Sequence, residues 1–125
     1  MPLVNVTAKN LESLITGNEI VILDFWAPWC GPCQSFAPIF EKAAETHPDI
    51  VFGKINTEEE PALAGHFQIR SIPTLIVFRD QIMLMNQAGA LPGQAFEELI
   101  SKVRELDMDD VRRQIAEAEA QQQGG

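Results

Sequence analysis

The feature that most constrains this chain is a pair of cysteines between a strand-like run and a helix-like run. Cys30 and Cys33 are the only cysteines of the sequence. The preceding run, Ile20–Trp26, is apolar without alternation, which is typical of a central strand covered on both faces of a parallel sheet. The following segment, 34–47, has helical spacing of its apolar residues. With Cys33 in the first helical turn, both sulfurs lie on one helix face and can form a disulfide that opens and closes reversibly.

The start of this helix also predicts the chemistry of the pair. Free backbone amides and the positive end of the helix dipole stabilise an anion, so the thiolate of Cys30 is favoured over its thiol. We expect Cys30 to be the nucleophile, and Cys33, one turn further in, to be less exposed and to react second. Gly31 lets the chain turn tightly, and Pro32 suits an early helical position because an N–H there would have no partner.

Composition narrows the class of protein. A chain of 125 residues with 46% hydrophobic content suits one domain with a continuous core. A formal charge of −9 without a Lys/Arg cluster argues against nucleic-acid and anionic-membrane surfaces, and favours protein or small-molecule partners. The sequence shows neither a signal peptide nor a bilayer-length apolar run, so we expect the cytoplasm. A single CxxC beside strand and helix patterns indicates a redox motif there.

The remaining patterns predict an α/β fold. They indicate strands at 3–6, 50–55, 74–78 and 82–88. They also indicate a helix that follows a Thr7 N-cap and ends at 17, a short helix through 67 whose capped start is marked by Thr57, three glutamates and Pro61, and a helix that follows Pro92-Gly93 and extends to 106. The short connection at 79–81 favours an antiparallel hairpin. The order βαβαβαββα predicts a central mixed sheet of about five strands flanked by about four helices. The CxxC follows a strand, and open α/β sheets bind ligands at the carboxyl ends of their strands.

The chain divides into a domain at 1–107 and a C-terminal extension at 108–125. Met108, Val111, Ile115 and Ala118 form a thin helical stripe among charged residues, and the segment 121–125 has the composition of a disordered tail. The extension is most simply a short helix that trails from the preceding helix or folds back on it. A docking element for one particular partner is the alternative.

Asp24 stands out as a carboxylate inside the apolar run. Burial of its charge costs free energy and raises its pKa toward neutrality, which makes it a usable proton acceptor. An edge-strand carboxylate that faces water is the alternative. We expect Trp26 to pack in the core and not on the rim of a site.

In its motifs the chain resembles the thioredoxin family, from about residue 4 to residue 106. The resemblance rests on an ordered set of segments: Asp24-Phe25-Trp26-Ala27-Pro28-Trp29-Cys30-Gly31-Pro32-Cys33, Lys54, Ile69-Arg70-Ser71-Ile72-Pro73-Thr74 and Gly89-Ala90. It implies the thioredoxin fold, reduction of protein disulfides by dithiol–disulfide exchange, and a role in electron transport and cell redox homeostasis. It also implies re-reduction by thioredoxin reductase, to which NADPH and FAD belong, so that this chain needs no cofactor besides its cysteine pair.

The resemblance assigns roles to particular residues. Cys30 matches the family's nucleophile and Cys33 its resolving thiol. Asp24 matches a buried aspartate that helps to deprotonate the resolving cysteine, and Lys54 matches a lysine near that carboxylate. The charge of Lys54 would partly oppose the rise in the pKa of Asp24, so the two should titrate together. An ordinary surface lysine is the alternative for Lys54.

The resemblance also implies a substrate surface. The bond before Pro73 is expected to be cis and to face Cys30, which leaves the backbone of Ile72 free to pair with an extended substrate. The expected apolar rim consists of Trp29, Gly31, Pro32, Ile72, Gly89 and Ala90. Three features depart from the family pattern: Gln34 replaces a basic residue, Phe67 replaces a tyrosine, and Asp80-Gln81 replaces Asn-Gly in the hairpin turn.

Other functions of the cysteine pair are weighed against these expectations. Half of a zinc site would need two more ligands, and only His47 and His66 are available as nitrogen ligands, so we expect no metal. A purely structural disulfide is unusual in the cytoplasm. A redox-independent binding or co-chaperone module would use the same apolar rim, while an oxidase or isomerase would reverse the direction of exchange. We expect a monomeric protein-disulfide reductase.

Overall fold

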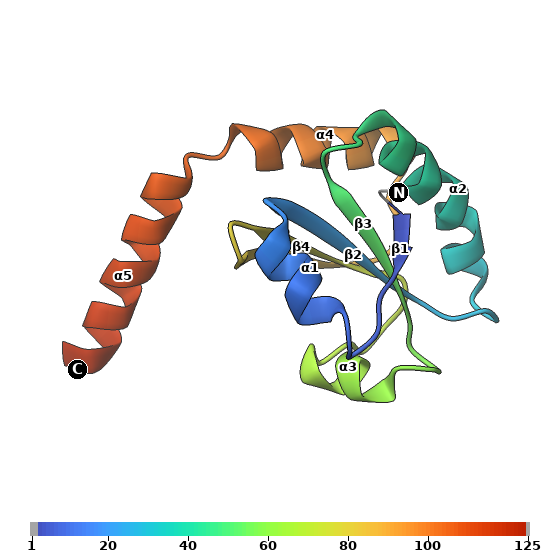
Figure 1. Ribbon diagram of the computed structural model, residues 1–125, viewed down its shortest axis with the longest axis horizontal. Helices are drawn as coiled ribbons and strands as arrows, with labels where there is room; N and C mark the ends of the chain where they lie inside the picture. The colour runs from blue at the N-terminus through green and yellow to red at the C-terminus, as the bar shows by residue number, and fades with distance from the viewer. Residues whose placement is uncertain (1–2, 125) are drawn as a thin grey trace.

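The structure, a computed structural model, describes residues 3–124 and contains five strands and five helices (Figure 1). In chain order these are β1 (Leu3–Asn5), α1 (Leu11–Gly17), β2 (Ile20–Trp26), α2 (Gly31–Thr46), β3 (Val51–Asn56), α3 (Pro61–His66), β4 (Thr74–Arg79), β5 (Ile82–Ala88), α4 (Gly93–Glu105) and α5 (Met108–Gly124). The predicted order βαβαβαββα, with a helical extension, is confirmed. None of the described helices is both long and apolar enough to cross a bilayer.

The five strands form one mixed sheet in the order β1-β3-β2-β4-β5. The central strand is β2, as its unbroken apolar run predicts. It pairs in parallel with β3, which places Asp24 opposite Lys54, and antiparallel with β4, which places Asp24 opposite Leu75. The predicted hairpin joins β4 to β5, and its turn residues Asp80 and Gln81 both have positive φ. Because β2 is the central strand, the loop that follows its carboxyl end starts between the ends of β3 and β4.

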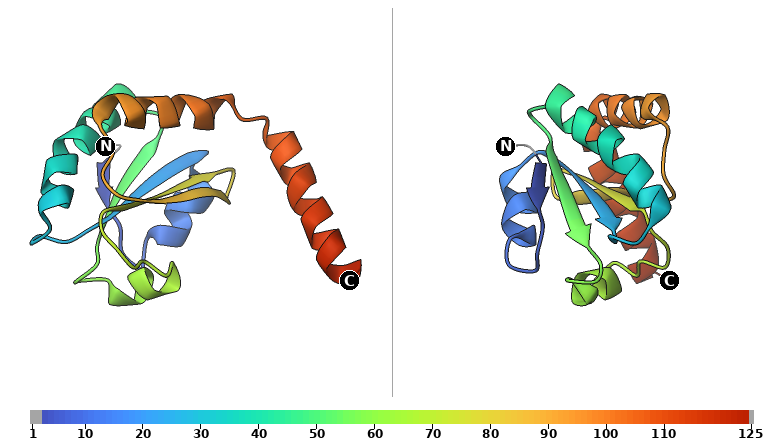
Figure 2. Two further views of the ribbon diagram at one scale, coloured as in Figure 1. Left: turned by 180° about the vertical axis from the view of Figure 1, so that it is seen from behind. Right: turned by 90° about the vertical axis from the view of Figure 1, so that its right-hand side faces the viewer.

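Each face of the sheet is covered by two helices (Figures 1 and 2). Alternate residues of β2 contribute to opposite faces, so Ile22 packs with α2 and α4, whereas Leu23 packs on the side of α1 and α3. Phe36, Phe40, Phe52 and Phe96 form a group of contacting rings on the α2/α4 face, with centroids 5.3–6.3 Å apart. These buried rings fix the position of α2 on the sheet.

Helix α2 passes through Pro38 without ending, as its apolar stripe predicts. At its far end His47 lies between two residues of α4. The Nε2 atom of His47 lies 2.7 Å from Oε2 of Glu97, and Nη2 of Arg104 donates to Nδ1 at 3.0 Å. Arg104 also binds both carboxylate oxygens of Asp49, which lowers the pKa of Asp49 to about 2. We call these four residues, His47, Asp49, Glu97 and Arg104, the anchor cluster of α2.

The end of α4 is tied to the sheet by Arg79. Its guanidinium donates to the carbonyl oxygens of Val103, Arg104 and Leu106 at 2.8, 3.3 and 2.9 Å. These carbonyls lie at a helix terminus and have no helical partner of their own.

Helix α5 leaves the end of α4 and extends away from the sheet (Figures 1 and 2). Met108 is buried, and Arg112 reaches Asp80 of the hairpin turn at 3.3 Å, while the residues from 112 to 122 are exposed. The disordered tail expected from residue 121 is wrong for 121–124, because the helix continues to Gly124; Gly125 lies outside the described residues. Exposed pairs such as Arg113 with Asp110 and Glu117 support this helix along its length.

Two helix starts differ from the prediction. Helix α3 has Glu60 as its N-cap, although the sequence indicated a capped start from Thr57. The N-cap of α1 is Asn10 and not Thr7. The side chain of Asn10 instead accepts a hydrogen bond from the amide of Thr7 at 2.8 Å, which closes a turn before the helix.

Candidate active site

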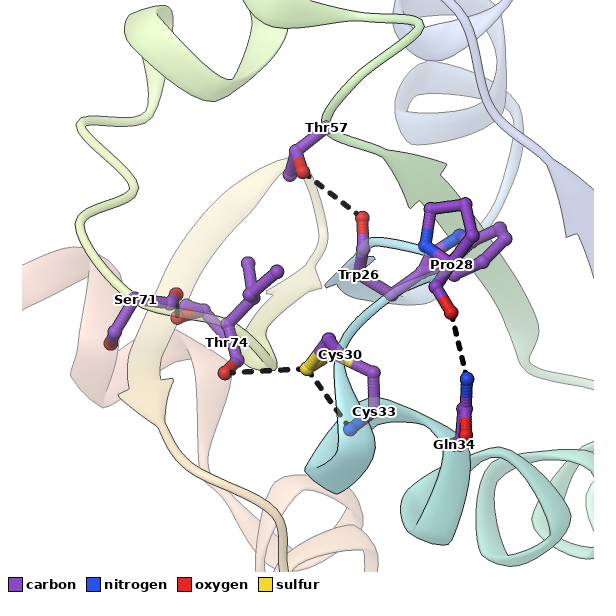
Figure 3. The surroundings of a disulfide bond; sticks show 9 residues. Trp26, Pro28, Cys30, Cys33, Gln34, Thr57, Ser71 and Thr74 are labelled. Carbon is purple, nitrogen blue, oxygen red and sulfur yellow. Dashed lines mark hydrogen bonds between the residues drawn. A yellow bond between two sulfur atoms is a disulfide. The ribbon is translucent and has the colours of Figure 1, made fainter.

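Cys30 and Cys33 form a disulfide at the start of α2, with α-carbons 5.2 Å apart (Figure 3). The second cysteine lies in the first turn of the helix, as the spacing predicts, and Pro32 occupies an early position that needs no hydrogen-bond donor. The pair lies directly after the carboxyl end of β2. The loop and helix thus hold the two sulfurs at bonding distance.

The sulfur of Cys30 is the N-cap group of α2. Cys30 has an extended backbone, and the amide of Cys33 donates to its Sγ at 3.2 Å (Figure 3). The same donor and the helix dipole would stabilise a thiolate on Cys30 after reduction. Exposure does not distinguish the two cysteines as we expected, because they are 4% and 3% exposed. What distinguishes them is that the helix amide points at Cys30.

Gln34 holds the loop in front of the cysteines. Its Nε2 donates to the carbonyl oxygen of Pro28 at 2.7 Å (Figure 3), and the amide of Cys30 donates to Ala27 at 3.2 Å. The sequence presented Gln34 as the loss of a positive charge near the thiolate. In the structure Gln34 also stabilises the loop, because its hydrogen bond to Pro28 fixes the segment that leads into α2.

The segment 71–74 lies against Cys30 from the other side. The bond between Ile72 and Pro73 is cis, as the resemblance implies, and the carbonyl oxygen of Ile72 lies 3.8 Å from Sγ of Cys30. Within residues 3–124 the backbone of Ile72 is not paired with another backbone group, whereas the carbonyl of Pro73 accepts from the amide of Gly89 at 2.8 Å. Gly89 has φ of +101°, a conformation that glycine adopts without strain.

The surface around the disulfide combines apolar and polar residues. Trp29 is 70% exposed, Ile72 is half-buried, and the remaining expected rim residues Gly31, Pro32, Gly89 and Ala90 are exposed. A groove of about 210 Å³ beside the disulfide is lined by Trp29, Thr57, Ala64, Ile69, Arg70, Ser71 and Ile72. Its polar members Thr57, Arg70 and Ser71 were not predicted as site residues. Arg70 and Ser71 lie in the segment 69–74 that carries the resemblance, whereas Thr57 directly follows β3 and has no sequence signal that connects it to the cysteines. A larger groove of about 340 Å³ between β5 and α4 is lined by other residues and does not include the cysteines.

Asp24 is buried completely, so the alternative of a water-facing carboxylate is wrong. Neither of its carboxylate oxygens has a hydrogen-bond partner among the described residues. Burial raises the pKa of Asp24 to about 7, and the charge of Lys54 partly opposes this rise. The carboxyl can therefore take up and release a proton near neutral pH.

Lys54 is half-buried and lies against Trp26. Its Nζ atom is 4.7 Å from the centroid of the indole ring. Trp26 is itself half-buried, and it packs against the small cluster of Ala27, Cys30 and Cys33 instead of the two large cores. The expectation of ordinary core packing for Trp26 is therefore corrected: the residue stands at the end of β2, where the sheet meets the cysteine pair.

Neither histidine lies at this site. His47 belongs to the anchor cluster, and His66 is exposed in the last turn of α3. Among residues 3–124 no group of three His, Cys, Asp or Glu side chains is placed to hold a metal ion.

Comparisons with known proteins agree with this geometry. The thioredoxin family model matches residues 2–102. A protein described as putative thioredoxin 2 of Streptomyces coelicolor is 52% identical over 118 residues, which cover 94% of this chain and 88% of that protein. A thioredoxin of Alicyclobacillus acidocaldarius is 38% identical, covering 78% of this chain and 94% of that one. The solved structure of a mutant thioredoxin from Halobacterium salinarum NRC-1 has a TM-score of 0.78 and 34% identity, over 84% of this chain and 93% of that chain.

Proposed function

This chain belongs to the thioredoxin family and is a thiol–disulfide oxidoreductase, and we propose that it reduces disulfide bonds of other proteins and is re-reduced by thioredoxin reductase. The observation that carries the proposal is the position of Cys30. Its sulfur caps a helix and lies 3.8 Å from the carbonyl of Ile72, a residue whose backbone has no other backbone partner within residues 3–124.

The substrate would bind as an added strand beside Ile72. Backbone hydrogen bonds of this kind give affinity with little demand on side-chain sequence, which suits an enzyme with several protein substrates. The exposed indole of Trp29 and the small residues Gly89 and Ala90 would contact the apolar parts of such a segment. We assign Pro73 and the rim residues to substrate binding; the rim residues are Trp29, Gly31, Pro32, Ile72, Gly89 and Ala90.

The exchange reaction transfers two electrons in two steps. The thiolate of Cys30 attacks one sulfur of the substrate disulfide, forming a mixed disulfide and releasing the other substrate sulfur as a thiolate. Cys33 then gives its proton to Asp24 and attacks Sγ of Cys30, so that the second substrate sulfur leaves. The substrate is reduced to a dithiol, and the enzyme is left with the Cys30–Cys33 disulfide.

The cycle closes when an electron donor reduces the Cys30–Cys33 disulfide. We assign this step to an NADPH-dependent thioredoxin reductase, whose flavin would pass two electrons to the pair. The enzyme would then need no cofactor besides its cysteines. A reducing compartment such as the cytoplasm suits the cycle, because the dithiol is the form that acts on substrate. We propose that the enzyme works as a monomer.

The test is a coupled assay with NADPH, thioredoxin reductase and insulin as the disulfide-bonded substrate. The wild-type enzyme should consume NADPH as insulin is reduced, and Cys30→Ser should show no activity. Cys33→Ser should accumulate a covalent enzyme–insulin mixed disulfide that a thiol reagent releases.

Three outcomes would contradict the proposal. An active Cys30→Ser variant, or a Cys33→Ser variant that traps nothing, would refute the assigned order of attack. A protein partner that binds the double serine variant as tightly as the wild type would favour the redox-independent binding module, which would use the same exposed Trp29 surface.

A further inference from the structure

The geometry points to Trp26 as a positioning residue. Its indole face holds the ammonium group of Lys54 beside Asp24, and thereby adjusts how readily Asp24 accepts the proton of Cys33. This inference rests on the proposed role of Asp24 in the exchange reaction. It assigns to Trp26 a task beyond packing, although the ring does not accept or donate the proton.

Three side chains meet on one face of the sheet. Asp24 and Trp26 are two residues apart on β2, so both point to the side that also carries Ile22 and Phe52. Lys54 lies directly opposite Asp24 in the parallel pairing of β2 with β3. Its Nζ atom lies 4.7 Å from the indole centroid, within the roughly 6 Å range of a cation–π interaction.

Lys54 needs such a contact to remain near the carboxyl group. A lysine ammonium is a compact charge on a flexible stem that water solvates strongly. Because the attraction between charges weakens with distance and with access to water, a freely moving Lys54 would act less on Asp24. The ring replaces part of the water around the ammonium and restricts where it can lie.

Trp26 is held at its backbone and at its side chain. The carbonyl oxygen of Trp26 accepts hydrogen bonds from the amide of Thr57 at 2.9 Å and from its hydroxyl at 3.1 Å (Figure 3). The side chain packs against Ala27 and the cysteine pair. The indole can therefore fix the position of Lys54, because its own position is fixed by the loop after β3 and by the start of α2.

Other charges do not complicate the surroundings of Asp24. Lys54 is the charged group that acts on its pKa among the described residues, and the residue opposite on β4 is the apolar Leu75. The two cysteines do not titrate while they form the disulfide. The oxidised protein is thus the form in which the effect of Trp26 on Asp24 can be isolated.

A purely structural role for the ring predicts the opposite sign. If Trp26 only shields Asp24 from water, its removal lets water in and lowers the pKa of the carboxyl. If the ring positions Lys54, its removal weakens a favourable interaction of the carboxylate and raises that pKa. The two effects can be separated even when both are present, because only the effect on Lys54 disappears when Lys54 is replaced.

The experiment is a double-mutant cycle read by NMR. The carboxyl carbon of Asp24 is titrated in the oxidised form of the wild type, Trp26→Leu, Lys54→Gln and the double variant. We expect Trp26→Leu to displace the midpoint to higher pH in the Lys54 protein relative to its effect in the Lys54→Gln protein. Equal displacements in the two backgrounds would overturn the inference, because the ring would then act independently of the lysine.

Trp26→Phe is the conservative variant, and it keeps the inference testable if Trp26→Leu does not fold. Its smaller ring can still face the ammonium, so its displacement should lie between those of the wild type and Trp26→Leu. In the mixed-disulfide form of the enzyme, the pH profile of the rate at which Cys33 releases the substrate should shift to higher pH in Trp26→Leu. The carboxyl titration uses no substrate, so it can fail or succeed independently of the proposed activity on protein disulfides.

Discussion

Asp24 and Lys54 lie directly opposite each other on the neighbouring parallel strands β2 and β3, yet the carboxylate makes no hydrogen bond with any described residue. A buried, unpartnered carboxylate costs free energy in its charged form. The central strand therefore carries a group that suits proton transfer and lowers the stability of the folded chain at neutral pH.

The first prediction concerns this cost. The pKa of Asp24 rises from its ordinary value of 3.8 to about 7 on folding. At a pH between these two values, Asp24 is protonated in the folded chain and ionised in the unfolded chain. The contribution of Asp24 to stability is thus largest below 3.8 and is lost as the pH rises through about 7. We expect Asp24→Asn to stabilise the protein more at about pH 8 than at about pH 3.5, by on the order of 4 kcal/mol. Urea unfolding at both pH values measures this difference, and an equal effect at the two would contradict it.

A second prediction concerns the packing of β3. A β-carbon added at Gly53 would lie 2.6 Å from Cγ2 of Val6 and 3.0 Å from Cδ2 of Leu23. Both neighbours are buried, and the valine side chain is stiff. Gly53→Ala should therefore lower the free energy of unfolding by about 1–3 kcal/mol. Gly65→Ala, where an added carbon meets nothing within 4 Å, is the matched control and should not destabilise. Chemical denaturation of both variants gives the comparison.

A third prediction concerns the end of α4. Arg79→Met keeps the apolar stem of the side chain but removes the donors to the carbonyls of Val103, Arg104 and Leu106. We expect a loss of about 1.5–3 kcal/mol in the free energy of unfolding, typical of hydrogen bonds from a charged group. Arg113→Met is the control, since Arg113 is exposed on α5 and should matter little. Similar melting temperatures for the two variants would show that the contacts of Arg79 contribute little.

A fourth prediction separates the two halves of α5. A chain that ends at residue 114 keeps the buried Met108 and the Arg112–Asp80 ion pair, so its melting temperature and insulin reduction should match those of the full chain. A chain that ends at residue 107 loses both contacts and should melt at a lower temperature. If the two truncations behave alike, the first turns of α5 do not belong to the folded domain.

Much of the fold could be predicted because the apolar pattern and the packing agree. Ile20–Trp26 lacks polar alternation, and the structure covers it on both faces at the centre of the sheet. The short connection after β4 favoured an antiparallel hairpin, and the structure has one. The positive φ values of Asp80 and Gln81 could not be predicted in the same way, because neither residue type requires that conformation.

The misses have local causes. Several polar residues precede α1, and the pattern did not show which of them would lie at its N-cap. Asn10 lies there, and its side chain accepts a hydrogen bond from the amide of Thr7. The Gln-rich end has a composition that suits disorder, but Ala, Glu and Gln are also good helix formers, and α5 continues to Gly124. Trp26 is expected in the core because large aromatic residues dominate cores, but its residue type does not show that it stands at the end of β2 beside the cysteine pair.

The site was predicted unevenly. Cys30, Cys33 and Asp24 carry their chemistry in their residue type, so the sequence alone pointed to them. Thr57 and Gln34 support the site through hydrogen bonds to the backbone of Trp26 and Pro28, which depend on how separate segments fold together. No spacing rule connects these pairs.

Helix α2 has sixteen residues and so separates its two ends by about 24 Å. One end carries the cysteines, and the other is fastened by the anchor cluster. Substitutions around Trp29 are therefore not expected to disturb the contacts of His47. Variation of the surface beside the cysteines should therefore leave the thermal tolerance of the scaffold largely unchanged.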